Sequence, residues 1–413
     1  MPHPQALSAV VERGLCTGCG LCRSMAGGEA IDMAVTSFGQ MRPQFKRPLD
    51  RALEARILEA CPGATIEGPE TQEVPAHPVY GVMLSHERAW AADEAVRFRA
   101  AAGGVMTALG VHLLRSGEVE AILHVRAVPE RPFHADAQIS RTPEEVIAGA
   151  QSRYGPAAPL VHVMRLLDEG ARFAVLAKPC DISAIRNLGK RDPRVARQIP
   201  YLVTIFCGGI ANDSTATKIA AFHGVEREDV KLFRWRGNGW PGPTHIEARD
   251  GRVFDLSYEQ TYFDKSKPWT YNLPFRCKIC PDAVGEAADI AVPDGWMIEE
   301  GTRIFREAAG VNLAVVRTTA GARLMADAVK AGALVTAPCS LAELSIMHAD
   351  HVRRKLGHPA RALALWLAGQ AHPRTRHFRP WQAMRANGWR HNWATFRGSL
   401  RRVRAGANRE PLR

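Results

Sequence analysis

The sequence predicts an α/β protein with a mixed, partly parallel sheet, a cysteine-rich N-terminal module and a basic C-terminal tail. Apolar strands alternate with amphipathic helices through the middle of the chain, which is typical of such a sheet. Four of the nine cysteines precede residue 70, and residues 351–413 hold fifteen Lys or Arg with a single acid, Glu410. We therefore expect three parts: residues 1–70, residues 71–345, and a helical or partly disordered tail at 346–413.

The middle part is predicted from hydrophobic periodicity and from helix and turn signals. Glycine residues close two of the expected helices, and Asp250-Gly251 is a hairpin turn signal. The expected strands are 119–125, 172–177, 201–206, 311–318 and 333–337; the expected helices are 103–117, 181–189, one from about 212 and 322–332; the expected hairpin is 244–256.

Composition and charge exclude several classes of protein. The chain has 413 residues, 46% hydrophobic and 23% charged, which is typical of a globular protein. No apolar run reaches the ~18 residues of a membrane span, and no basic-then-apolar leader begins the chain, so we expect a cytoplasmic protein. The net charge of +12 is concentrated in the tail and leaves the body nearly neutral, so nucleic acid is not a favoured partner. Nine cysteines in a reducing compartment indicate metal ligation or redox chemistry.

The strongest motif is Cys16-x-x-Cys19-x-x-Cys22 followed at a distance by Cys61-Pro62. Bacterial ferredoxins hold [4Fe–4S] clusters with three thiolates at this spacing and a fourth followed by proline. The sequence therefore predicts a ferredoxin-like module with one [4Fe–4S] cluster. The alternatives are a zinc site, which usually uses paired Cys-x-x-Cys units, and structural thiols.

A second cysteine group is spread over the middle part. Cys180 and Cys207 each follow an expected strand, and Cys277-x-x-Cys280 precedes Pro281. Ligands gather at the carboxyl ends of strands in α/β sheets, so these four thiols could supply one metal centre. The alternative is that they are small buried hydrophobic residues. Cys339 has no partner in this scheme and is expected to be structural.

Five stretches, together with the N-terminal motif, resemble the coenzyme F420 hydrogenase/dehydrogenase beta-subunit family. The stretches are AAGGVMTALGVHLLRSG (101–117), SRYGPAAP (152–159), LAKPCDISAIRNL (176–188), IFCGGIAN (205–212) and FRCKICPDAVGEAADIAVPDGW (275–296). Relatives in this family include subunits of F420-reducing hydrogenases and formate dehydrogenases, 7-hydroxymethyl chlorophyll a reductase and a ferredoxin-dependent 8-vinyl reductase. The resemblance implies FAD and two [4Fe–4S] clusters, the second held by Cys180, Cys207, Cys277 and Cys280. Coenzyme F420 is a candidate substrate, although the long basic tail departs from the coenzyme-reducing members and nothing marks a deazaflavin pocket.

The flavin site must be built without the usual fingerprints, because neither G-x-G-x-x-G nor a P-loop is present. Gly103-Gly104 precedes an expected helix, where phosphate could approach the amides and Thr107 could donate its hydroxyl; simple helix initiation is the alternative. Lys178 follows a buried strand and is expected to hydrogen-bond the flavin ring and stabilise its reduced form, unless it is a solvated surface lysine. The further candidates are Ser152 and Tyr154, with Asp264 a weaker one.

Three hypotheses about function are weighed on these motifs. The leading hypothesis is an iron–sulfur flavoprotein oxidoreductase that passes electrons between clusters and FAD and acts on an organic substrate. The alternative is an electron-transfer beta subunit of a larger hydrogenase or dehydrogenase, and a third is a zinc-stabilised nucleic-acid-binding protein. Ferredoxin or a redox subunit is the expected partner, and a homo-oligomer is compatible with the sequence. The tail, with Arg and Trp interleaved at 381–404, is expected to contact an anionic membrane or an acidic partner.

Overall fold

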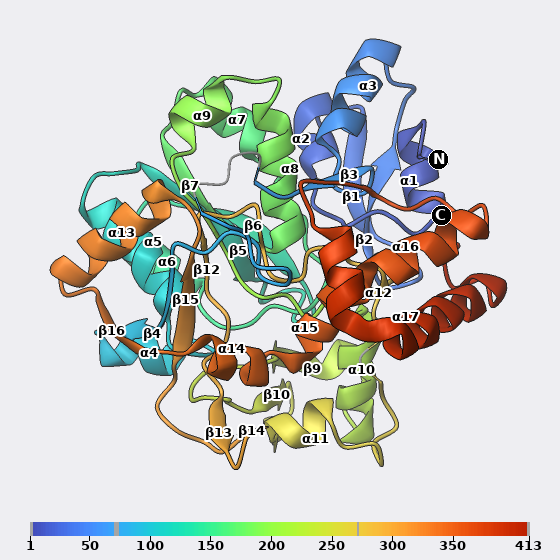
Figure 1. Ribbon diagram of the computed structural model, residues 1–413. Helices are drawn as coiled ribbons and strands as arrows, with labels where there is room; N and C mark the ends of the chain where they lie inside the picture. The colour runs from blue at the N-terminus through green and yellow to red at the C-terminus, as the bar shows by residue number, and fades with distance from the viewer. Residues whose placement is uncertain (1–2, 70–73, 271, 411–413) are drawn as a thin grey trace.

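The computed structural model describes residues 3–69, 74–270 and 272–410 and contains an eight-stranded mixed sheet (Figure 1). Four central strands, β12, β8, β7 and β5, run parallel, and antiparallel strands flank them on both sides. In sheet order the strands are β16 (Leu334–Pro338), β4 (Ser85–Ala91), β15 (Asn312–Val316), β12 (Ile290–Ala291), β8 (Leu202–Thr204), β7 (Phe173–Leu176), β5 (Ala121–Ala127) and β6 (Ala135–Ser140). The predicted α/β class with a mixed sheet is confirmed.

Helices cover both faces of this sheet because the strand residues alternate between two cores. In β7, Ala174 and Leu176 pack with α5 (Val105–Arg115) and α13 (Thr319–Lys330). Phe173 and Val175 point the other way, toward α8 (Pro179–Gly189). The same two cores involve α4 (Glu94–Arg99) and α6 (Pro143–Ala148) on the first face, and α7 (Val163–Asp168) and α9 (Arg194–Gln198) on the second.

The expected elements of the middle part correspond to elements of the structure. The predicted helix 103–117 is α5, the predicted helix 181–189 is α8, and the strands at 172–177 and 201–206 are β7 and β8. The predicted hairpin consists of β10 (Thr244–Ala248) and β11 (Val253–Leu256), with Gly251 at φ 92° in its turn. Three strands of the large sheet, β4, β6 and β12, were not predicted from the sequence, and β12 has only two residues.

The N-terminal part consists of three short helices, a two-stranded hairpin and a third short strand. Its elements are α1 (Leu7–Glu12), α2 (Leu21–Ala26), β1 (Ile31–Val35), β2 (Met41–Phe45), α3 (Arg51–Ala60) and β3 (Thr65–Glu67). Strands β1 and β2 pair antiparallel, and β3 pairs in parallel with β17 (Arg374–Arg376) from the tail. The amide of Glu410 also donates to the carbonyl of Glu12, so the end of the tail lies against the end of α1.

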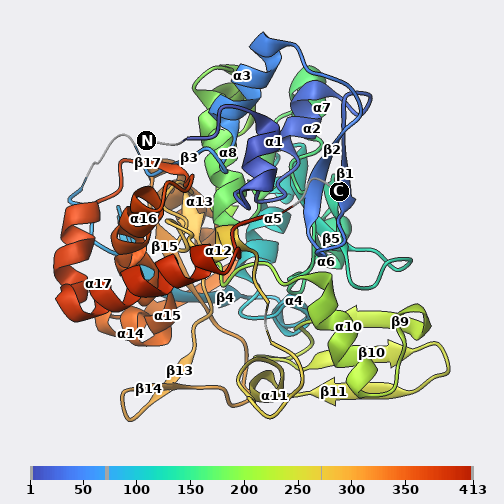
Figure 2. The same cartoon turned by 90° about the vertical axis from the view of Figure 1, so that its right-hand side faces the viewer.

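A smaller three-stranded sheet projects from the body (Figure 2). It is formed by β9 (Val230–Arg234), β10 and β11, and α10 (Asp213–Phe222), the short 3-10 helix η1 (Arg227–Asp229) and α11 (Tyr258–Tyr262) pack beside it. A further hairpin, β13 (Met297–Glu299) with β14 (Thr302–Ile304), follows the sheet strand β12. Aromatic contacts between Tyr258, Trp296 and Phe305 join these parts to each other.

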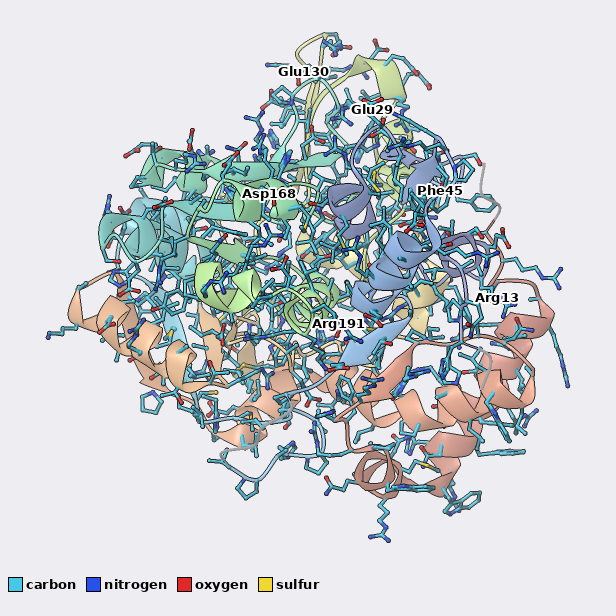
Figure 3. The ribbon with its side chains drawn as sticks, turned by 90° about the horizontal axis from the view of Figure 1, so that it is seen from above. Arg13, Glu29, Phe45, Glu130, Asp168 and Arg191 are labelled. Atoms are coloured by element: carbon cyan, nitrogen blue, oxygen red, sulfur yellow. The ribbon has the colours of Figure 1, made fainter. Side chains whose placement is uncertain are left out.

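The tail is largely helical and packs on the N-terminal part and on the short helix α12 (Phe275–Lys278). It comprises α15 (Ala349–Leu356), α16 (His358–Leu367), β17 and the long α17 (Pro380–Arg404), which is broken at Gly388, and α14 (Leu341–Met347) leads into it. Seen from above, the tail helices lie beside the N-terminal helices (Figure 3). Within the described ranges, none of the helices has the length and apolar character that a bilayer crossing needs.

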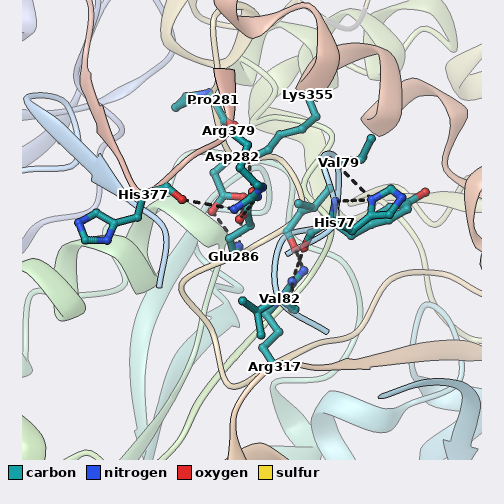
Figure 4. A network of polar contacts seen from close by, with 12 residues as sticks. His77, Val79, Val82, Pro281, Asp282, Glu286, Arg317, Lys355, His377 and Arg379 are labelled. Carbon is teal, nitrogen blue, oxygen red and sulfur yellow. Dashed lines mark hydrogen bonds and ion pairs between the residues drawn. The ribbon is translucent and has the colours of Figure 1, made fainter. Parts of the chain in front are cut away.

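A buried ion network fastens the tail to the segment that follows Cys280 (Figure 4). The Glu286 side chain is 0% exposed and pairs with both Lys355, which precedes α16, and Arg379, which precedes α17. Lys355 also donates to the carbonyl of Pro281 at 3.0 Å, and the amide of Glu286 donates to Asp282. Burial raises the pKa of Glu286, but the two cations outweigh it and hold the pKa below its usual value.

We predict that Glu286→Gln destabilises the fold by about 3–5 kcal/mol, because it leaves two buried cations without a full counter-charge. Chemical denaturation at pH 7 measures this loss. Asp136→Asn is the matched control, because its exposed pair with Arg131 contributes at most about 1 kcal/mol. Since the folded pKa of Glu286 is depressed, its contribution is present above the unfolded pKa of glutamate and disappears as the pH falls toward the folded value. An equal loss in both variants at pH 7 would contradict the prediction.

Candidate functional site

The four N-terminal cysteines line one cavity. Cys16, Cys19 and Cys22 come from the loop before α2 and its first turn, and Cys61 follows α3 directly. The rest of the wall is apolar apart from Thr17, and it is formed by Leu7, Val10, Val11, Gly20, Leu21, Met33, Pro43 and Ile57. Glycine is needed at Gly18 because its φ is 72° and a Cβ there would lie 2.8 Å from the carbonyl oxygen of Met41. The structure thus brings together the four thiols that the spacing singled out.

The other four cysteines line a second cavity. Cys180 lies in the first turn of α8, directly after β7, and Cys207 follows β8. These two strands are parallel neighbours, so their carboxyl ends deliver both thiols to the same edge of the sheet. Cys277 and Cys280 reach the same cavity from α12 and the residues just beyond it. Cys339 lines neither of these two cavities.

The two cavities adjoin, because Cys16 and Thr17 contribute to the walls of both. Arg42 also lies between the two groups of thiols. Burial alone would lower the pKa of its guanidinium, but the nearby thiolates of Cys16 and Cys277 and the carboxylate of Glu410 raise it. The ion pair between Arg42 and Glu410 is bidentate, at 2.7 and 3.0 Å. The single acid of the tail therefore positions a cation at the junction of the two cavities.

The thiols are held in a setting that makes their free ionisation costly. Burial raises the pKa of Cys61 to about 11, although the amides of Gly63 and Ala64 act against it. Burial likewise raises the pKa of Cys207 to about 12, with the amide of Gly209 opposing it. Amide donors aimed at sulfur, with the Gly18 amide 3.4 Å from the sulfur of Cys16 as a further case, are typical of the surroundings of iron–sulfur ligands. The sites therefore favour a ligated thiolate over a free one.

Positive side chains surround the second cavity. Arg276 opposes the effect of burial on the pKa of Cys61, Cys180 and Cys277, so it acts on both groups of thiols. Arg354, from α15, lines the second cavity and donates to the carbonyl oxygen of Cys207 at 3.1 Å. The sequence analysis missed Arg42, Arg276 and Arg354. Adjacency to Cys277 could have suggested Arg276, whereas the other two reach the cavity only through the tertiary fold.

Lys178 is a largely buried residue in the wall of the second cavity and not a solvated surface lysine. Its side chain is 15% exposed and its ammonium nitrogen lies 2.6 Å from both carboxylate oxygens of the fully buried Asp181. Burial lowers the pKa of Lys178, but Asp181 and the thiolates of Cys180 and Cys19 raise it more strongly. Lys178 is therefore a charged group in the wall of the second cavity, and a role beside a flavin ring stays a prediction.

The donor sets fit iron–sulfur clusters. Each cavity is lined by its own group of four thiols, with Cys16 also reaching the second; the first has no carboxylate in its wall and the second has only Asp282. Burial raises the pKa of Asp282, which disfavours its ionised form as a competing ligand. Soft, all-sulfur ligand sets of this kind suit iron–sulfur centres. Among the described residues, no three His, Cys, Asp or Glu side chains converge on one point as the ligands of a single metal ion do.

The glycine pair expected to receive a phosphate is packed against the sheet. A Cβ on Gly103 would lie 2.5 Å from the amide nitrogen of Asn312 and 2.8 Å from the carbonyl oxygen of Ala89. Gly104 caps α5 with φ at 77°, and the side-chain oxygen of Asn312 accepts from the amide of Val105. Thr107 lies half-buried in the first turns of the helix. Sheet packing alone accounts for glycine at position 103, and a phosphate contact at this helix stays a prediction.

The predicted loop residues Ser152 and Tyr154 lie beside a buried arginine. Ser152 forms an isolated bridge with Arg236, and the Arg236 guanidinium donates to the hydroxyl of Tyr154 at 3.2 Å. Arg236 also pairs with Asp294 and donates to the carbonyl of Ala101, just before the glycine pair. The structure thus brings the 152–154 loop and the start of α5 to one place.

Three arginines lie next to this loop, and none of them forms an ion pair with a carboxylate in the part of the chain that the structure describes. Burial lowers the pKa of Arg153 to about 10, and the charges of Arg99 and Arg234 lower it further. The guanidinium of Arg153 is held by the carbonyls of Ala150 and Ser152. A partly buried cluster of like charges is suited to an anion such as a diphosphate. Asp264 lies apart, at the end of α11, where it accepts hydrogen bonds from Ser266 in a local turn.

Comparisons with known proteins agree with this organisation. Residues 87–165 match the family model for the N-terminal part of the coenzyme F420 hydrogenase/dehydrogenase beta subunit, and residues 170–341 match the model for its C-terminal part. The solved F420-reducing [NiFe] hydrogenase complex from Methanosarcina barkeri contains a chain with a similar fold. The match has a TM-score of 0.55 and 18% identity and covers 73% of this chain and 99% of that one.

Curated proteins of similar sequence agree with the family matches. The chain is 26% identical to F420-dependent formate dehydrogenase 1 subunit beta of Methanococcus maripaludis, over 60% of this chain and 59% of the relative. It is 22% identical to coenzyme F420-dependent sulfite reductase of Methanocaldococcus jannaschii, over 70% of this chain and 44% of the relative. It is 26% identical to coenzyme F420 hydrogenase subunit beta of Methanothermobacter thermautotrophicus, over 63% and 86%.

The match thus spans less than two thirds of the first two relatives. The two family models nevertheless cover the whole sheet domain in order, and the relatives are oxidoreductases or their subunits. The chain belongs to the coenzyme F420 hydrogenase/dehydrogenase beta-subunit family.

Proposed function

We propose that the protein is an electron-transfer subunit of an oxidoreductase complex that relays electrons through two [4Fe–4S] clusters to and from FAD. The observation that carries this proposal is the pair of adjoining cavities, the first lined by one group of four thiols and the second by the other group of four together with Cys16, which lies in the walls of both. Adjoining sites suit a relay. The relatives are beta subunits of F420-dependent hydrogenase and formate dehydrogenase, which favours this reading over an enzyme with an organic substrate of its own.

The chain's residues have defined tasks in this proposal. Cys16, Cys19, Cys22 and Cys61 would hold one cluster, and Cys180, Cys207, Cys277 and Cys280 the other. Clusters exchange electrons singly and a flavin exchanges them singly or in pairs, so together they connect one-electron and two-electron partners. Arg42, Arg276, Arg354 and Lys178 compensate negative charge at the two sites, and the Gly18 amide orients toward Cys16. Arg99, Arg153 and Arg234 are suited to hold the FAD diphosphate, beside Ser152 and Tyr154.

Anaerobic purification of the full chain tests the proposal as a whole. We expect about eight irons and eight sulfides per chain, one FAD and a visible spectrum with cluster and flavin bands. Reduced ferredoxin and reduced coenzyme F420 are then compared as electron donors. A colourless, zinc-loaded protein would rule the proposal out, and stoichiometric reduction of an organic substrate without a partner subunit would favour the independent enzyme.

The two cysteine groups give separate predictions. Cys19→Ala should remove about four irons and leave FAD bound, because the first cavity is formed by the N-terminal part. Cys277→Ala should remove about four irons and also lower the thermal midpoint more, because the second cavity joins the sheet, α12 and the tail. Cys339→Ala is the matched control and should change neither quantity. Iron and flavin analysis with calorimetry decides, and full iron content in Cys277→Ala would contradict the second assignment.

Lys178 and Asp181 should shift a reduction potential in opposite directions. Lys178→Met removes a positive charge next to the cavity of Cys180 and should lower the potential of the reducible group there by on the order of 50 mV. Asp181→Asn removes the neighbouring negative charge and should raise it. Lys231→Met, whose exposed side chain pairs with Glu247, serves as control. Redox titration followed by electron paramagnetic resonance measures all three, and equal shifts of one sign would contradict the charge mechanism.

Arg153 should matter for flavin retention. Arg153→Gln removes one cation of the three-arginine cluster and should weaken FAD binding roughly tenfold or more, because charge-assisted hydrogen bonds contribute about 1.5–3 kcal/mol each. Arg131→Gln, on an exposed pair outside the cluster, should leave FAD binding unchanged. Fluorescence titration of the flavin-depleted chain gives both dissociation constants. Unchanged FAD affinity in Arg153→Gln would remove this cluster from the flavin site.

A further inference from the structure

The tail carries an unusual concentration of exposed tryptophan. Trp366, Trp381, Trp389 and Trp393 are 47%, 76%, 74% and 56% exposed, and all lie on α16 or α17. The other five tryptophans of the chain are buried or half-buried. Leu363 and Leu367 of α16 are also exposed. Tryptophan rings cost free energy when left in water, so a surface that presents four of them is suited to binding.

Arginine shares the exposed face of α17 with these rings. After the break at Gly388, exposed residues recur at positions 389, 390, 393, 397, 401 and 404, which are Trp, Arg, Trp, Arg, Arg and Arg. At 3.6 residues per turn, these positions fall within a sector of about 120°. Ser399, which is buried, lies outside this sector and marks a side of the helix that packs on the protein. The outer face of α17, meaning these six residues, is therefore aromatic along one edge and cationic along the other.

The arginines of this face are not neutralised by other described residues. None of Arg390, Arg397, Arg401 and Arg404 forms an ion pair with another described residue, unlike Arg376 and Arg379 before the helix. No Asp or Glu occurs between residues 351 and 409. An uncompensated row of guanidinium groups favours an anionic partner, and guanidinium geometry matches phosphate oxygens well.

We propose that the outer face of α17, together with Trp366 and Trp381, docks the protein on the surface of an anionic phospholipid bilayer. Tryptophan prefers the headgroup region, where one part of the ring is apolar and the other is wet. Arginine next to it binds the lipid phosphates, and helices that combine both features lie in the plane of the interface.

Nucleic acid fits the same face less well. Stacking on bases requires free ring faces. Trp393 already stacks on Phe396, with centroids 5.5 Å apart, and the Arg390 guanidinium lies 5.4 Å over the ring of Trp389. An apolar protein interface would gather the rings into one core patch with charges around its rim, whereas here the rings and the guanidinium groups run side by side along one face of the helix.

Vesicle binding by the full-length protein tests this proposal and requires no activity. We expect sedimentation with vesicles of phosphatidylglycerol and phosphatidylcholine, little sedimentation with phosphatidylcholine alone, and release at high salt. The triple variant R390Q/R397Q/R401Q should bind about a hundredfold more weakly, since each basic residue near an anionic surface contributes about fivefold. W381A/W389A should bind roughly tenfold more weakly and should lose most of the blue shift in tryptophan fluorescence on vesicle addition.

Matched controls separate this face from general charge and hydrophobicity. R115Q/R126Q/R197Q removes the same number of exposed, unpaired charges from the body of the protein, and F98A/F222A removes exposed rings of 62% and 48% exposure. Both should bind vesicles like the unmodified protein. Equal binding to neutral vesicles, full binding by R390Q/R397Q/R401Q, or tighter binding to single-stranded RNA that depends on the same residues would overturn the proposal.

Discussion

The carboxylate of Glu286 fixes how the tail meets the rest of the protein. It is fully buried, and it pairs with Lys355 from one part of the tail and Arg379 from another. A buried carboxylate requires such partners, because an unpaired charge in the interior costs several kcal/mol. The network leaves Arg354, the neighbour of Lys355, in the wall of the second cavity. The position of that wall therefore depends on an interaction that touches none of the eight thiols.

The same requirement for paired charge applies where the two cavities meet. Arg42 is buried there between Cys16 and Cys277, and Glu410 from the other end of the chain holds it in a bidentate pair. Arg276 acts on thiols of both groups, and Lys178 with Asp181 forms a third charged element. These groups come from the N-terminal hairpin, α12, the start of α8 and the last residues. Negative charge added at either cavity would be felt by cations shared with the other, because the local dielectric is low.

Local pattern was enough to predict the frame of the sheet. The helix at 103–117, the strand at 172–177 and the Asp250-Gly251 turn carry their own signals of period, cap and turn, and each is present in the structure. The N-terminal cysteine triplet was identified from its spacing alone. By contrast, β12 has two residues and takes its conformation from pairing with β8 and β15 on its two sides, so no local signal could reveal it.

The site residues that the sequence did not predict were missed for a different reason. Arg354 and Glu410 belong to the tail, whose composition suggests a basic appendage, and their contacts join positions 147 and 368 residues apart in sequence. Glycine at 103 is an ambiguous signal, because packing on β4 and β15 already requires it whether or not a ligand binds there. Contacts of this range depend on the folded chain as a whole, which spacing and periodicity do not record.

The tail therefore presents two faces with different chemistry. Toward the protein it places Lys355, Arg379 and Glu410 in buried pairs, which fix position because their replacement would leave charges uncompensated. Toward solvent it places exposed rings and arginines that form no ion pair with a described residue. These arginines contribute little to folding because water solvates their charges. Substitutions on the inner face should act on stability and on the second cavity, whereas substitutions on the outer face of α17 leave both intact. That separation allows docking and electron transfer to be examined independently in one polypeptide.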